Sequence, residues 1–139
     1  MVKIISPLES TIREASDAYF FDFFCCGDGC SYELFAHDVG VTLIEKSSEI
    51  YWVSQITSLD AEPEAESLIP SVLSKHLLLL EFRTSLFLAE NELKLLMVSR
   101  ARDLGIESFV KIFEDFIFCT LEVRNILNPR SYSFTNKAL

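Results

Sequence analysis

The fold is decided by residues 63–99, whose sequence is PEAESLIPSVLSKHLLLLEFRTSLFLAENELKLLMVS. The first half has the helical period, because mostly apolar residues recur at positions i, i+3, i+4 and i+7. These residues are Ile69, Val72, Leu73 and His76. Pro63 suits the first helical position, where its missing N–H costs nothing. Pro70 lies about two turns further on, so the helix either begins later or kinks there.

The second half of this stretch changes to the period of a strand. Residues 85–90 alternate in the manner of a strand, residues 90–92 can turn the chain, and Leu93 to Ser99 form a second strand. We therefore predict a helix followed by a hairpin. Because both are apolar on every side, the rest of the chain must cover them.

A three-stranded meander is predicted before the helix. The segments SYELFA (31–36), VTLIE (41–45) and IYWVSQIT (50–57) are rich in β-branched and aromatic residues. Short polar connections at residues 37–40 and 46–49 separate them, and such connections favour antiparallel pairing.

Helices are predicted at both ends of the chain. Pro7 to about Phe21 follows a possible N-cap at Ser6, and residues 106–127 have a strong helical period with many aromatic positions. The predicted class is α+β, with the order α-β-β-β-α-β-β-α and a five-stranded, mainly antiparallel sheet with packed helices. We expect a single domain over residues 1–127 and a flexible tail over residues 128–139.

The composition limits the classes of partner. The chain has 139 residues, of which half are hydrophobic and twelve are Phe, and its formal net charge is −9. That charge argues against nucleic acid and against anionic membrane surfaces. No run approaches the roughly 18 apolar residues of a membrane span, and the first residues lack the pattern of a secretory signal. We therefore expect a cytoplasmic protein whose cysteines are reduced.

Chemical sites are sparse in the sequence. Cys25, Cys26 and Cys30, with His37, could bind zinc or act as a Cys-His nucleophile. A structural zinc site needs a second ligand pair, and a nucleophile needs an orienting third group; neither is evident. We favour a turn with reduced thiols and predict no catalytic residue, no metal, no cofactor and no enzymatic activity.

The surplus of aromatic residues is the more informative feature. Phe20, Phe21, Phe23 and Phe24 widen the apolar surface of the first predicted helix beyond one stripe, and Phe118 and Leu121 do the same in the last. Because a helix packed on a sheet needs only one apolar side, these residues indicate a second buried surface and hence a protein partner.

The chain resembles the class I type III secretion chaperones, the Tir-chaperone or CesT-like family. The resemblance covers about residues 8–127 and rests on size, acidity and the order of elements. Three local features add to it: the pair SYELFA and VTLIE, the acidic lead-in LDAEPEAESLIPSVLSKHLLLL, and the hairpin TSLFLAENELKLLMVS before a long aromatic helix. The bulky segment at residues 77–82 and the Cys-rich turn after the first helix depart from the family pattern.

The resemblance implies a bacterial cytoplasmic homodimer without catalytic activity. Such proteins bind an extended N-terminal segment of a secreted effector, keep it secretion-competent, and help to target it to the export apparatus, whose ATPase is a further possible partner. The candidate effector-binding residues are Phe20, Phe21, Phe24, Tyr32, Leu34, Leu43 and Trp52. The candidate dimer-interface residues are Leu68, Val72, His76, Leu78, Leu79, Leu80, Leu86 and Leu88.

A second class of protein shares the charge and the lack of chemical sites. An acidic immunity protein or antitoxin that inhibits a basic toxin would present carboxylates at its interface, whereas a chaperone would present apolar grooves. The apolar surplus favours the chaperone.

Overall fold

The structure, a computed structural model, describes most of the chain, namely residues 7–26, 31–61, 67, 70, 83–100 and 105–127. The helices are α1 (Pro7–Tyr19) and α4 (Ile106–Leu127). The strands are β1 (Asp22–Cys25), β2 (Ser31–Ala36), β3 (Val39–Lys46), β4 (Glu49–Ser58), β5 (Thr84–Ala89) and β6 (Glu92–Arg100). The helix predicted within residues 63–99 lies outside the described residues, apart from Ser67 and Pro70.

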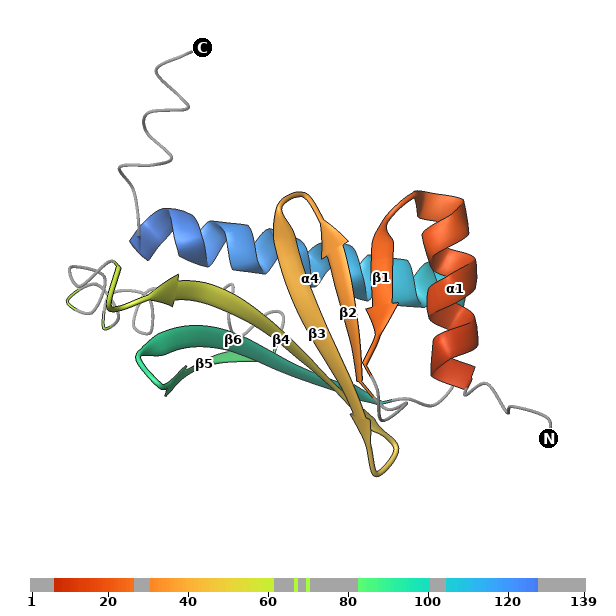
Figure 1. The fold of residues 1–139 in the computed structure, drawn as a ribbon, viewed down its shortest axis with the longest axis horizontal. Helices are drawn as coiled ribbons and strands as arrows, with labels where there is room; N and C mark the ends of the chain where they lie inside the picture. Colours follow the sequence, from red (N-terminus) through yellow and green to blue (C-terminus); the bar gives the residue numbers. More distant parts are fainter. Residues whose placement is uncertain are drawn as a thin grey trace, which may run out of the picture.

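The strands form one antiparallel sheet in the order β1-β2-β3-β4-β6-β5. Both described helices lie on one face of it, as Figure 1 shows. The predicted α+β class and its chaperone-like architecture are confirmed. The strand count is corrected, because the sheet has six strands where the sequence predicted five.

The additional strand is β1, whose residues were expected to close the first helix. Helix α1 ends at Tyr19 because Phe20 adopts a left-handed backbone conformation, with φ of 58°. The Phe20 N–H still donates to the Ser16 carbonyl at 2.9 Å, which is the usual bond of a left-handed helix cap. The chain then reverses, and Phe23 of β1 pairs with Leu34 of β2.

Three tight turns set the register of the sheet. The two-residue connections are His37–Asp38, Ser47–Ser48 and Glu90–Asn91, and every one of these residues has positive φ. Such turns match the twist of antiparallel strands, although Asn-Gly or Asp-Gly is the preferred sequence for them. The three predicted meander strands and the hairpin are therefore present, with β3 beginning two residues earlier than expected.

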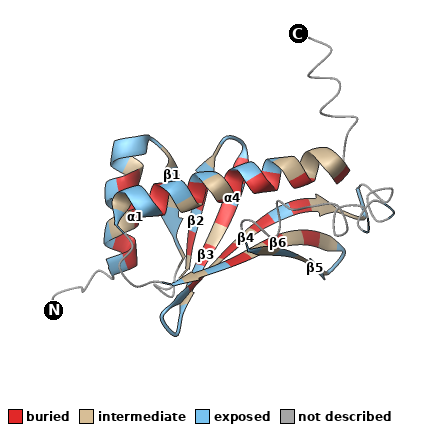
Figure 2. Ribbon diagram, turned by 180° about the vertical axis from the view of Figure 1, so that it is seen from behind, coloured by how far each residue is buried: buried red, intermediate tan, exposed pale blue. Residues whose placement is uncertain are grey.

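The core lies between the sheet and the helices. Figure 2 shows buried segments along α4 and along the strands that it crosses. The Trp52 ring of β4 lies 5.3 Å from Phe109, 6.4 Å from Phe113 and 6.2 Å from Phe116, measured between centroids. Its indole Nε1–H donates to the Ser99 hydroxyl at 2.8 Å, so the buried polar atom is satisfied.

Two polar contacts attach α4 to β4 within and beside this core. The Thr120 hydroxyl donates to the Phe116 carbonyl at 2.8 Å, so the Ser54 hydroxyl, also 2.8 Å away, must donate to Thr120. Nearer the end of α4, Arg124 donates from Nε and Nη2 to the Gln55 carbonyl at 3.0 and 2.6 Å, where β4 has a register shift. Burial lowers the pKa of Arg124 from its usual value.

Candidate functional site

An exposed aromatic cluster marks the point where α1 ends and β1 begins. We call Tyr19, Phe20 and Phe21 the aromatic corner. Phe20 is 91% exposed and Tyr19 is 48% exposed, whereas Phe21 is half-buried. The Phe21 ring packs edge-on against Phe113 of α4, with centroids 5.0 Å apart. Phe21 therefore anchors the corner to the core while Phe20 projects into solvent.

Two hollows adjoin the aromatic corner, and Phe20 and Phe21 line both. The helix-side hollow, of about 190 Å³, is lined by Tyr19, Phe20, Phe21, Ala36, His37, Val110, Phe113, Glu114 and Ile117. The open hollow, of about 520 Å³, is lined by Ser16, Asp17, Phe20, Phe21, Asp22 and Phe23. An apolar side chain from another molecule could therefore contact Phe20 on either side.

Strand β1 is an edge strand of the sheet beside this corner, and α1 lies next to it (Figure 1). Directly after β1, the Cys26 N–H donates to the Ser31 carbonyl at 2.9 Å, so every second residue back along β1, Phe24 and Asp22, forms hydrogen bonds with β2. By that alternation the main-chain groups of Phe23 point away from β2. An extended peptide could add to this edge, as in other proteins that recognise peptides by strand addition.

The sequence did not single out the residues of α4 that complete the helix-side hollow. Val110, Phe113 and Ile117 recur at i, i+3 and i+7, but the same period describes any helix packed on a core. His37 lines the hollow from the β2–β3 turn. Only the tertiary arrangement brings these segments together.

Phe24 lies elsewhere, on the face of the sheet opposite the helices. It is 61% exposed, and its ring packs against Phe35 with centroids 5.7 Å apart. Phe35 in turn lies over Gly40, where an added Cβ would stand 3.1 Å from the ring. The structure thus separates Phe24 from Phe20 and Phe21, with which the sequence had grouped it.

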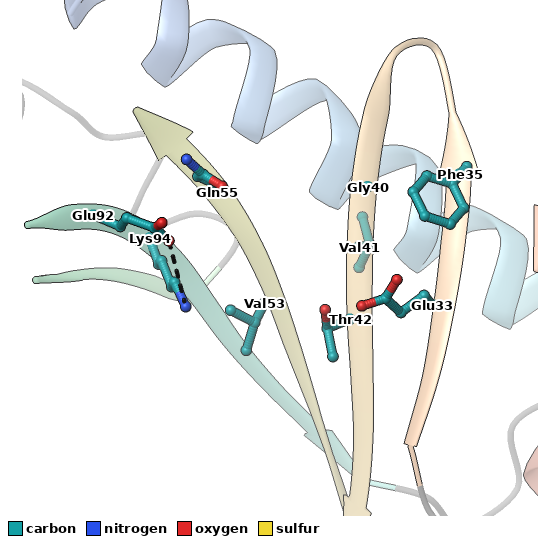
Figure 3. A pocket seen from close by; sticks show the side chains of 9 residues that line it. All are labelled: Glu33, Phe35, Gly40, Val41, Thr42, Val53, Gln55, Glu92 and Lys94. Atoms are coloured by element: carbon teal, nitrogen blue, oxygen red, sulfur yellow. Dashed lines mark ion pairs between the residues drawn. The ribbon is translucent and has the colours of Figure 1, made fainter. Parts of the chain in front are cut away.

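A third hollow lies on this outer face, as Figure 3 shows. Its volume is about 210 Å³, and its lining residues are Glu33, Phe35, Gly40, Val41, Thr42, Val53, Gln55, Glu92 and Lys94. Lys94 and Glu92 form an ion pair at 3.9 Å within it. The charges of this hollow are of both signs, in contrast with those at the aromatic corner.

Four of the predicted effector-binding residues belong to the core. Tyr32, Leu34, Leu43 and Trp52 are each fully buried, with 0% exposure. They occupy alternate positions of β2, β3 and β4 that face the helices, and α4 supplies the aromatic cover that their number requires. The prediction that these four residues line a binding groove is therefore corrected. The candidate binding surface is now the aromatic corner alone.

Most of the predicted dimer-interface residues cannot be placed. Leu68, Val72, His76, Leu78, Leu79 and Leu80 lie outside the described residues. Leu86 and Leu88 point to the same face of β5 and pair with Leu95 and Leu93 of β6. Leu86 packs partly against the core, whereas Leu88 is 56% exposed.

The cysteines differ in their environments. Cys25 is exposed and its thiol donates to Glu9 Oε1 at 3.5 Å, Cys26 is half-buried, and Cys30 lies outside the described residues. Burial raises the pKa of the Cys119 thiol, against the opposing hydrogen bond with Thr84. Among the described residues, no three His, Cys, Asp or Glu side chains are grouped to hold a metal ion.

Comparison with known proteins supports the fold. Neither a protein-family model nor a curated protein sequence matches this chain. A chain in the crystal structure of the ExsC–ExsE complex is similar over 91% of this chain and 97% of its own length, with 14% identity and a TM-score of 0.66. YbjN from E. coli, a candidate transcription regulator, is similar over 95% of this chain and 97% of its own, with 15% identity and a TM-score of 0.57.

These similarities concern the fold. The chain has the chaperone-like fold that its resemblance to the class I type III secretion chaperones predicted, and that prediction is confirmed. In the described part of the chain, neither helix combines the length and the apolarity needed to cross a membrane.

Proposed function

We propose that this chain is a type III secretion chaperone that binds an extended N-terminal segment of a secreted effector and keeps it soluble and secretion-competent. In this proposal the chain acts without catalysis, as a homodimer in the bacterial cytoplasm, and delivers its cargo to the export apparatus and its ATPase. One observation carries the proposal: Phe20 is 91% exposed beside two hollows, in a fold shared with a chain of the ExsC–ExsE complex.

Two features of Phe20 are unfavourable in the free protein: its exposed ring and its left-handed backbone conformation. A phenyl ring in water forgoes about 2 kcal/mol of burial energy. A non-glycine residue in the left-handed region costs a further 1 kcal/mol or so. Such costs concentrate at binding and catalytic sites, where a partner or the function offsets them.

The surroundings of Phe20 suit an extended peptide better than a compact ligand. The edge of β1 offers main-chain groups at Phe23, and Phe20 lines both hollows. A strand added to that edge would place alternate side chains toward the helix layer. Main-chain hydrogen bonds would then supply affinity, and the hollows would select apolar side chains.

The test compares two exposed phenylalanines four residues apart. The tagged full-length chain is expressed in its native bacterium as parent, Phe20→Ala and Phe24→Ala, and co-purified proteins are identified by mass spectrometry. We expect an exported protein to be retained by the parent and by Phe24→Ala, to be lost from Phe20→Ala, and to be bound through its N-terminal segment. Deleting the gene should reduce secretion of that protein.

Two results would overturn the proposal. One is equal retention of the exported protein by Phe20→Ala, provided that circular dichroism shows both variants folded. The other is normal secretion in the deletion strain.

The net charge of −9 keeps one alternative open, an acidic immunity protein or antitoxin. Such a protein would protect cells against a co-expressed basic toxin, and its complex would weaken strongly with added salt. Capture of a toxin rather than an exported effector, with Phe20→Ala still active in protection, would favour this alternative.

A further inference from the structure

The charges at the aromatic corner are of one sign. Asp17 and Asp22 line the open hollow and Glu114 lines the helix-side hollow, and all three side chains are exposed. Among the described residues, no Lys or Arg lines either hollow. His37 also lines the helix-side hollow.

These carboxylates are not neutralised from within the described part of the chain. None of the three takes part in an ion pair among the described residues. Arg13, on the same helix as Asp17, lies over Phe23 of the open hollow, with its guanidinium carbon 5.4 Å from the ring centre, but its charge is paired with Glu9, whose Oε2 is 3.2 Å from Arg13 Nε.

The outer-face hollow shows the contrast within the same molecule. There Lys94 pairs with Glu92, so a ligand would meet charges of both signs. At the aromatic corner a ligand would meet an apolar surface with carboxylates in both of the hollows that Phe20 lines. Potentials across protein interfaces are complementary, and like charges brought together weaken binding.

We infer that the segment bound at the aromatic corner carries an apolar side chain flanked on both sides by Lys or Arg. This inference rests on the proposed function and specifies the chemistry of its ligand. The apolar side chain enters the hollows beside Phe20, and the basic side chains lie against Asp17 and Asp22 on one side and Glu114 on the other. The acidic corner excludes acidic segments of equal hydrophobicity, and its charge speeds the encounter with basic ones.

The experiment selects ligands without assuming the identity of the effector. A library of random 12-residue peptides displayed on phage is selected against the purified full-length chain. The enriched peptides are then synthesised, and their affinities are measured for the parent, for Phe20→Ala, and for the charge-reversed variant Asp17→Lys/Asp22→Lys. A single variant, Glu114→Lys, tests the other side of the corner.

A matched control separates local charge from net charge. Glu49 and Glu90 are exposed residues beside and within the tight turns. Each substitution of an acid by Lys adds two charges, so Glu49→Lys/Glu90→Lys and Asp17→Lys/Asp22→Lys both move the formal net charge from −9 to −5. Thermal melts establish that every variant is folded.

We expect the enriched peptides to combine an aromatic or aliphatic residue with flanking Lys or Arg. Their affinity should fall roughly tenfold in Asp17→Lys/Asp22→Lys and less in Glu114→Lys, because each exposed ion pair contributes only modestly and the first variant reverses two charges. The control variant should bind within about twofold of the parent. Raising the salt from 0.05 to 0.5 M should weaken binding to the parent more than to the charge-reversed variant.

Different failures point to different errors. Peptides that are apolar without basic residues, and that depend on Phe20 but not on the three carboxylates, would overturn this inference and leave the proposed function standing. Selected peptides whose binding does not depend on Phe20 would overturn the proposed site itself.

Two other occupants of the corner would overturn its assignment to an effector segment. The peptide of residues 128–139, NPRSYSFTNKAL, has Tyr132 and Phe134 between Arg130 and Lys137, so its displacing the selected peptides at equal concentration would agree with the inferred ligand chemistry but identify a segment of this chain as the occupant and overturn the proposed function. Self-association in light scattering that disappears in Phe20→Ala would identify a second copy.

Discussion

The centre of the sheet under α4 and the aromatic corner are both rich in aromatic rings, yet they differ in what the rings do. Under α4, Trp52 is fully enclosed by Phe109, Phe113 and Phe116, and its one polar atom is satisfied. At the corner, Phe20 is exposed in a strained backbone conformation. The first arrangement stabilises the fold, whereas the second costs stability and leaves a surface for a partner.

Truncation of Trp52 should have the largest effect on stability and tests this contrast most directly. Trp52→Ala should lower the free energy of unfolding by about 3–5 kcal/mol, because it removes a fully buried ring and leaves a cavity. Phe20→Ala should change it by no more than about 0.5 kcal/mol, since the ring has few neighbours. Guanidinium titrations followed by far-UV circular dichroism measure both, and comparable losses would contradict the division between core and corner.

The polar contact inside the core should have the next largest effect. Thr120→Val preserves shape but removes the acceptor of the Ser54 hydroxyl, which is then buried without a partner, and should cost about 1–3 kcal/mol. Adding Ser54→Ala should recover part of that loss. A double-mutant cycle by urea titration gives the coupling, and strict additivity of the two substitutions would argue against the hydrogen bond.

Glycine substitutions at Phe20 of the aromatic corner and at Phe24 of the outer face should change stability in opposite directions. Phe20→Gly should raise the free energy of unfolding by about 1 kcal/mol, because glycine adopts positive φ without steric cost. Phe24→Gly should lower the free energy of unfolding by about 0.5–1 kcal/mol, because Phe24 lies within β1 and glycine is unfavourable inside a strand. Differential scanning calorimetry would show the two melting temperatures moving apart, and a loss in both would mean that Phe20 contributes to folding.

The smallest expected effect concerns a turn distant from both regions. Asn91→Gly converts Glu90–Asn91 toward the preferred composition of its turn and should stabilise the fold by about 0.5 kcal/mol. Peptide binding at the corner should remain unchanged. Stabilisation accompanied by weaker binding would indicate that the corner depends on the distant hairpin.

The sequence predicted those elements whose signals are local. The range of α4 follows from a long helical period ended by Asn128 and Pro129, and β2 coincides with SYELFA. Strand β1 was missed because a run of phenylalanines after α1 is compatible with a helix face or with a short strand. The backbone reversal at Phe20 decided between them, and phenylalanine is not a residue that signals positive φ.

For the candidate site, the sequence determined that there are more aromatic residues than one core requires, and that the net charge of the chain is −9. It could not assign each ring to the core or to the surface. Trp52 and Phe20 are indistinguishable by residue class, but α4, distant in sequence, covers only the first. Periodicity and turn chemistry act between near neighbours in the chain, whereas burial depends on which distant segment packs on top, and only the tertiary structure decides that.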